Sequence, residues 1–235
     1  MDEMPLSPRR VGLNAFALKL FMAALMLMDH LYVFLPGFPV WFEAVSRLVA
    51  PCFCFLMTEG LVYTRSRKKY LLRLYTIGLI MLAMDFVFTA VFGTTPGNSI
   101  IMALAVSGSL ICAIDQAIAA ETPGEKTRFF LLAITLLAFS MVWEGFLVIP
   151  MMSLIFYYLR GRKRLMCAVF AAASLIFLAF FDFGKFQWLM IFSVIPIWFY
   201  NGQRGPSGLF AKWFFYVFYP AHIWILFILS QTFFR

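Results

Sequence analysis

The chain has 235 residues, of which 63% are hydrophobic and only 13% are charged, and its mean hydropathy is +0.90. A soluble globular domain carries about 45–50% apolar and about 25% charged residues, so this composition excludes that class of protein. The net charge of +8 lies mostly between hydrophobic stretches, which is typical of cytoplasmic loops in membrane proteins and argues against a nucleic-acid partner. We therefore expect an all-α, polytopic transmembrane helix bundle surrounded by the lipid bilayer.

Hydrophobic stretches separated by turn residues predict about nine helices. Their expected ranges are 15–35, 40–63, 71–92, 98–120, 129–143, 146–159, 165–181, 186–200 and 212–233. Because a membrane span needs about 20 residues, the short fifth, sixth and eighth helices are expected to be tilted, broken or partly re-entrant. Residues 1–12 are expected to form a cytoplasmic tail, and residues 13–235 a single transmembrane domain.

The first two predicted helices carry ionisable side chains at matching depth. Asp29 lies about 21 Å along the first span, and Arg47 lies about 10 Å along the second, which runs back from the other side. Ionisable groups at such depth usually mark a functional site, so Asp29, His30 and Arg47 are candidate catalytic residues. Two structural interpretations stay open. Asp29 and Arg47 could form an ion pair that joins the helices, or Glu43 and Arg47 could pair on one helix.

The second helix also contains Pro51 and Glu59. Proline lacks an N–H, so the carbonyl of Arg47 loses its usual partner and a kink is expected there. Free carbonyls at membrane depth are tolerated where they line a cavity. Glu59 lies near the cytoplasmic end of the helix, where it could serve a substrate or cap the basic loop.

The middle of the chain offers fewer candidates. Asn98 stands at the start of the fourth helix, as a helix cap or a polar site residue. Glu144 stands at a tight break, which suits a residue that lines the mouth of a site. Cys52 and Cys54 are two residues apart on a helix and point in different directions, so no metal site is expected. Three further acids are expected at helix ends or interfaces: Asp85, Asp115 and Asp182.

The last helix holds a second polar stripe. Its members share one helix face, which runs from the cytoplasmic edge to the middle of the membrane: Lys212, Tyr216, Tyr219 and His222. Pro220 frees the carbonyl of Tyr216, which is consistent with a cavity lining. The structural alternative is an interfacial belt of lysine and tyrosine with one hydrogen-bonded histidine.

Two basic clusters set the expected orientation. One comprises Arg65, Arg67, Lys68 and Lys69, and the other Arg160, Arg162, Lys163 and Arg164. Positively charged loops stay in the cytoplasm, so the N-terminus is expected to be cytoplasmic and the C-terminus external.

Five segments together resemble the TraX family of integral-membrane acetyltransferases, whose best-known member acetylates the N-terminus of conjugative pilin. They are Asp29-His30, then Arg47-Leu48-x-x-Pro51-x-Phe53-x-Phe55-x-x-x-Glu59-Gly60, Thr64-Arg65-Ser66-x-Lys68-Lys69-Tyr70-x-x-Arg73-Leu74, Tyr200-Asn201-Gly202-x-x-Gly205, and Lys212-x-Phe214-Phe215-Tyr216-x-Phe218-Tyr219-Pro220-x-His222. The family is also distantly similar to the membrane acyltransferases that modify glycans.

The resemblance implies an acetyltransferase in the bacterial cytoplasmic membrane, with acetyl-coenzyme A as the cytoplasmic co-substrate. The acceptor would be an amine or a hydroxyl of a pilin, another protein N-terminus, a glycan or a lipid. His30 would be the general base, and Arg47, supported by Asp29, would stabilise the tetrahedral intermediate. The residues expected at the coenzyme are Arg65, Lys68, Lys69, Arg73, Tyr200, Asn201, Arg204, Lys212, Tyr216, Tyr219 and His222.

Two other functions remain open at this point. A proton-coupled small-molecule transporter would also use intramembrane Asp29, His30 and Arg47, although no inverted repeat is visible in the sequence. A non-enzymatic pilus or secretion assembly factor would need these residues only for helix packing.

Overall fold

The computed structural model describes residues 12–97, 100–180, 186–206 and 208–234, without the side chains of residues 177–180 and 209–212. These parts are helical, and the expected all-α bundle is confirmed. The helices are α1 (Ala15–Phe34), α2 (Trp41–Ser46), α3 (Val49–Tyr63), α4 (Arg67–Phe92), α5 (Ile100–Ala119), α6 (Pro123–Ser140), α7 (Val148–Tyr158), α8 (Lys163–Phe180), the 3₁₀ helix η1 (Gln187–Ser193), α9 (Val194–Trp198) and α10 (Leu209–Phe233).

Within the described residues, five helical stretches are long and apolar enough to cross a membrane. They are Ala15–Phe34, Trp41–Tyr63, Arg67–Phe92, Ile100–Ala119 and Trp213–Phe233. The protein is therefore a multi-pass membrane protein. The expected tail of residues 1–12 lies almost wholly outside the described residues.

The second and eighth predicted helices are each broken in two. The second divides into α2 and α3 at Arg47 and Leu48, so the kink expected from Pro51 is confirmed. At this break the N–H of Leu48 bonds the carbonyl of Val45 at 3.4 Å instead of continuing the α-helical pattern. The eighth begins as η1 and continues as α9.

Helix α6 begins at Pro123, earlier than the predicted start at residue 129. The Thr122 hydroxyl accepts a hydrogen bond from the N–H of Glu125 at 3.2 Å and lies 3.1 Å from the Glu125 carboxylate. This is a side-chain N-cap with proline in the first turn, where its missing N–H costs nothing.

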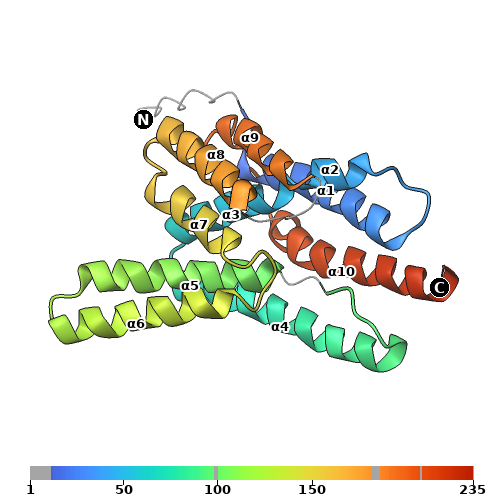
Figure 1. Ribbon diagram of the computed structural model, residues 1–235, viewed down its shortest axis with the longest axis horizontal. Coiled ribbons are helices and arrows are strands. Elements are labelled where there is room, and N and C mark those ends of the chain that lie inside the picture. The colour runs from blue at the N-terminus through green and yellow to red at the C-terminus, as the bar shows by residue number, and fades with distance from the viewer. Residues whose placement is uncertain (1–11, 98–99, 181–185, 207, 235) are drawn as a thin grey trace, which may run out of the picture.

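Three long helices, α1, α4 and α10, run in the same direction, and α10 lies between the other two (Figure 1). Near their starts, Lys19 of α1 lies 5.9 Å from the ring of Phe215 in α10. Further along, the rings of Phe34 in α1 and Phe227 in α10 are 5.9 Å apart. This parallel trio holds the functional site described below.

The loop after α9 fixes the start of α1. The N–H of Leu13 bonds the carbonyl of Phe199 at 2.8 Å, and the N–H of Asn201 bonds the carbonyl of Leu13 at 2.9 Å. Gly205 has a φ of 77° and lies against Asn14, where an added Cβ would be 2.6 Å from the amide oxygen. The glycine at this position therefore permits the close approach of the loop to α1.

Substitution of Asn14 by alanine is expected to destabilise the fold by about 0.5–2 kcal/mol, because its side chain caps α1 through the N–H of Ala17 at 2.8 Å. Thermal unfolding in detergent would measure the change. Asn14→Asp keeps a capping oxygen and should retain most of the stability. Equal unfolding temperatures for Asn14→Ala and the wild type would contradict the capping role.

Candidate functional site

The two histidines of the chain meet in the structure, although 192 positions separate them. Nε2 of His222 in α10 lies 3.1 Å from Nδ1 of His30 in α1, and their side chains are 6% and 5% exposed. The sequence analysis assigned them to different tasks, His30 to catalysis and His222 to the coenzyme. The signal that could have joined them was their similar depth in parallel spans.

Backbone carbonyls determine which nitrogen of each imidazole carries the hydrogen. Nδ1 of His30 lies 2.9 Å from the carbonyl of Met26, and Nδ1 of His222 lies 2.7 Å from the carbonyl of Phe218. A carbonyl can only accept, so both Nδ1 atoms carry hydrogen when the rings are neutral. His30 then shares its N–H between Met26 and Nε2 of His222, and the lone pair of His30 resides on Nε2.

Aromatic rings hold the imidazoles in position. Phe34 stacks on His30 with ring centroids 5.8 Å apart, and Phe218 stacks on His222 at 4.6 Å. The buried ring of Tyr219 lies edge-on to His222 at 6.0 Å. Because the rings are fixed by both stacking and hydrogen bonds, the histidine pair is preorganised.

Two carboxylates lie near the histidine pair, one on α4 and one in the connection between α6 and α7. Asp85 and Glu144 are both close enough to Tyr219 to interact electrostatically with its hydroxyl. Glu144 precedes Gly145 and Phe146, whose φ values of 79° and 42° make the tight turn expected from the sequence. Glu144 is exposed.

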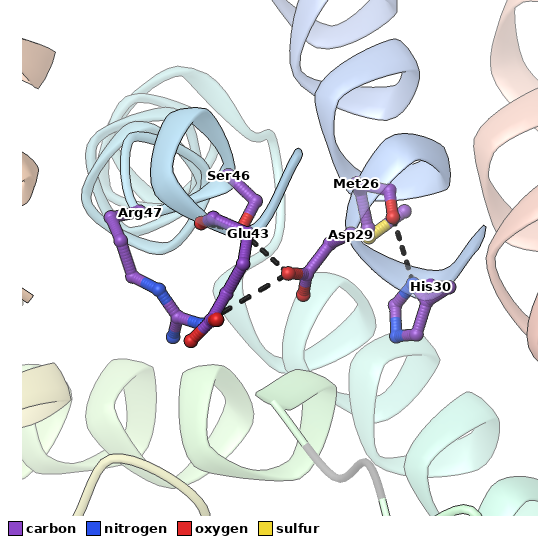
Figure 2. Close-up of polar contacts among 6 residues, drawn as sticks. All are labelled: Met26, Asp29, His30, Glu43, Ser46 and Arg47. Atoms are coloured by element: carbon purple, nitrogen blue, oxygen red, sulfur yellow. Dashed lines mark hydrogen bonds and ion pairs between the residues drawn. The ribbon is translucent and has the colours of Figure 1, made fainter. Parts of the chain in front are cut away.

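Asp29 and Arg47 form a separate cluster with two residues of α2 (Figure 2). The Ser46 hydroxyl lies 2.8 Å from both the Asp29 carboxylate and the carbonyl of Glu43. Arg47 donates to the Glu43 carboxylate at 2.9 Å and lies 4.0 Å from Asp29. Both structural interpretations of these charges therefore hold at once, the ion pair between helices and the pair within one helix.

The sequence analysis grouped His30 with Asp29 and Arg47 as candidate catalytic residues, but the structure separates His30 from the other two. Asp29 projects from α1 toward α2, whereas the His30 imidazole lies apart from that cluster, beside the carbonyl of Met26 (Figure 2). Adjacent residues on an α-helix are about 100° apart, so they face different neighbours. Asp29 therefore holds the corner between α1 and α2, whereas the partner of the His30 imidazole is His222 of α10.

Basic residues gather at the N-terminal ends of the parallel trio. The Arg73 guanidinium of α4 lies 5.9 Å from the ring of Tyr70 and interacts electrostatically with Tyr216 of α10. Its Nε is buried and has no hydrogen-bond partner among the described residues. Lys19 of α1, which the sequence analysis did not select, is close enough to Arg204 of the loop before α10 for the two positive charges to repel each other.

The other basic candidates point elsewhere. Lys68 lines an open groove of about 670 Å³ between α4 and α5, on the face of α4 opposite Arg73. Arg67 lines the same groove and forms a 2.6 Å ion pair there with Asp115. Arg65 and Lys69 are exposed. The structure therefore divides the expected coenzyme cluster into two sets.

Tyr200 and Asn201 have identifiable structural contacts. Asn201 donates to the carbonyl of Gly12 at 3.2 Å, which helps to fix the start of α1. Burial and the nearby Glu59 carboxylate, to which it is hydrogen-bonded, raise the pKa of Tyr200. Lys163 donates to the carbonyl of Tyr200 at 3.0 Å. Glu59 thus joins α3 to the loops at the basic end.

Two candidates fall outside what the structure describes. Asn98 is one of the undescribed residues, and the side chain of Lys212 is not described although its backbone belongs to α10. Among the described residues, no group of three or more histidine, cysteine or acidic side chains could hold a metal ion.

Comparisons with known proteins cover almost the whole chain. A family model described as TraX protein matches residues 15–230. The chain is also similar to the probable fimbrial assembly protein FimC, serogroup H1, of Dichelobacter nodosus. The two are 28% identical over 242 residues, which cover 93% of this chain and 96% of the relative. No solved structure gives a significant match.

Proposed function

The chain belongs to the TraX family, and from this membership and the site geometry we propose that it is a membrane-embedded acetyltransferase. It would move an acetyl group from acetyl-coenzyme A to an amine or hydroxyl. The observation that carries the proposal is the buried 3.1 Å contact between His30 and His222. A neutral, fixed imidazole in an apolar bundle is suited to accept a proton from an acceptor.

His30 acts as the general base in this proposal. Its Nε2 takes a proton from the acceptor while the acceptor nitrogen or oxygen attacks the thioester carbonyl carbon. The carbon–sulfur bond then breaks, and His30 returns the proton to the leaving thiolate, so free coenzyme A and an acetylated acceptor result. His222 accepts from Nδ1–H of His30, holds its tautomer and stabilises the transient positive charge.

The residues at the basic end suit the phosphates of the coenzyme. Arg73 has a buried Nε without a hydrogen-bond partner among the described residues, so a phosphate oxygen would satisfy it. Lys19 and Arg204 add positive charge. Along α1, the distance from Lys19 to His30 is about 16 Å, which the pantetheine arm would bridge between α1, α4 and α10.

The relative's name supports one choice of acceptor and also a rival function. Because that protein is named as a probable fimbrial assembly protein, the acceptor proposed here is the N-terminal amine of a fimbrial or pilus subunit. The bacterial cytoplasmic membrane is then the proposed location. The same name also favours a non-enzymatic assembly factor, in which the histidine pair would only pack helices.

The test is an acetyl-transfer assay with purified protein in lipid vesicles. Radiolabelled acetyl-coenzyme A is supplied in three separate reactions: with a fimbrial subunit, with a glycan, and with the vesicle lipid as the sole acceptor. We expect label on the subunit's N-terminal amine and release of an equal amount of coenzyme A thiol. Protein-free vesicles give the background. If thiol release is no faster than this background with any of the acceptors, the acetyltransferase proposal is contradicted and the assembly-factor function remains.

A further inference from the structure

Four phenylalanines, Phe34, Phe88, Phe92 and Phe227, form a contiguous cluster that we call the aromatic plug. Phe227 is its centre, with ring centroids 5.0 Å from Phe88, 5.8 Å from Phe92 and 5.9 Å from Phe34. Phe88 and Phe92 also contact each other at 6.3 Å. The plug therefore ties together all three helices of the parallel trio.

The plug lies directly beyond the histidine pair. Phe34 stacks on His30 with an interplanar angle of 11° and also contacts Phe227 of α10. Phe34 and Phe92 are the last residues of α1 and α4, so these helices end at the plug. His30 is only one helical turn, or about 6 Å, before the end of α1.

The centre of the plug is shielded from solvent. The side chains of Phe88 and Phe227 are 3% and 2% exposed, whereas Phe34 and Phe92 are partly exposed at the outer edge of the cluster. On the opposite side of the histidine pair lie Arg73, Lys19 and Arg204. The imidazoles are thus between a cationic end and a dry aromatic end.

A base that activates an acceptor amine can also activate water. Water attack on the thioester carbonyl would break the same carbon–sulfur bond and release acetate and coenzyme A thiol, with no acceptor modified. Closing a site against water suppresses this side reaction. Only a barrier between His30 and the nearby helix ends can provide such closure on this side of the pair.

We propose that the aromatic plug determines the specificity of the histidine pair for an acceptor over water, by closing the far end of the site. The proposal rests on the proposed acetyltransferase function. Phe227, at the centre, is the specificity-determining residue, and Phe88 supports it from α4.

The first test measures access and needs no enzymatic activity. Diethyl pyrocarbonate modifies imidazole nitrogen, and the chain's two histidines both lie behind the plug, so absorbance of the modified rings reports access directly. With protein purified without a histidine tag, Phe227→Ala should react about tenfold faster than the wild type, which corresponds to a barrier lower by 1.36 kcal/mol. Phe88→Leu should also react faster, with less disturbance of packing.

Phe156→Ala is the matched control. Phe156 in α7 is equally buried, 1% exposed, and packs against Phe55 and Phe170 away from the plug. Its loss loosens the core without opening the end of α1. If Phe156→Ala raises histidine reactivity as much as Phe227→Ala, or if neither plug variant raises it, the plug is not the barrier.

The second test compares hydrolysis with transfer. In Phe227→Ala, the ratio of released acetate to acetylated acceptor should rise about tenfold, for the same change in barrier. Faster histidine modification without any wild-type acetyl transfer would overturn the enzyme proposal but keep the plug as a seal. Wild-type transfer with an unchanged ratio and unchanged reactivity in both plug variants would overturn the plug and keep the enzyme.

Discussion

Replacement of His30 by glutamine is expected to lower the rate of acetyl transfer by about 10²–10⁴-fold, which is the usual contribution of a general base. Glutamine fills a similar volume and can still reach the carbonyl of Met26, but it cannot take up a proton. Initial rates with radiolabelled acetyl-coenzyme A, at saturating acceptor, measure the loss. Thermal unfolding in detergent verifies that the variant is folded.

His222→Gln is the matched variant on the opposite helix. Its amide oxygen can still accept a hydrogen bond from Nδ1 of His30, so we expect a much smaller loss than for His30→Gln. His222→Leu removes the acceptor and should be slower than His222→Gln. If His222→Gln loses more activity than His30→Gln, the base is His222. Retention of full activity by His30→Gln removes this ring from the chemistry.

Arg73→Met is expected to raise the KM for acetyl-coenzyme A by about 10–100-fold, because a hydrogen bond to a charged group contributes about 1.5–3 kcal/mol. The buried Nε of Arg73 would lose its phosphate partner, while the unbranched methionine keeps most of the packing against Tyr70. The value of kcat should change little, because Arg73 is far from the reacting carbon. Steady-state kinetics with varied acetyl-coenzyme A measure both parameters.

Lys68→Met is the control for this prediction. Lys68 lies on the same helix and carries the same charge, but it lines the α4–α5 groove on the opposite face. Its substitution should leave KM nearly unchanged. A large rise in KM for Lys68→Met, with none for Arg73→Met, would show that the coenzyme binds in the α4–α5 groove and would contradict binding at Arg73.

Much of the fold follows from local sequence patterns. The start of α1 at Ala15 and the end of α10 at Phe233 agree with the predicted ranges, because long apolar stretches define membrane helices. The break before Pro51 was also predictable, since proline affects only a carbonyl one turn away. The early start of α6 was missed because residues 123–128 carry no hydrophobic pattern, and the side-chain cap at Thr122 is what starts the helix there.

The candidate site was predictable only in part. Asp29, His30 and Arg47 were identified from charge at membrane depth, and the pairing of Glu43 with Arg47 was foreseen from their spacing. Lys19 was not selected because a single lysine near a helix start resembles an interfacial charge. The aromatic plug gave no sequence signal, because its members are four among 30 phenylalanines.

The sequence by itself determined where most of the helices lie, and that Asp29 and His30 face different directions. These properties depend on residues within one or two turns. Only the tertiary structure decided that His30 meets His222, that Arg47 stays with Asp29, and that Arg73 and Lys68 face apart. The physical reason is that the rotation of a helix about its axis is fixed by packing against distant helices, and no local pattern specifies it.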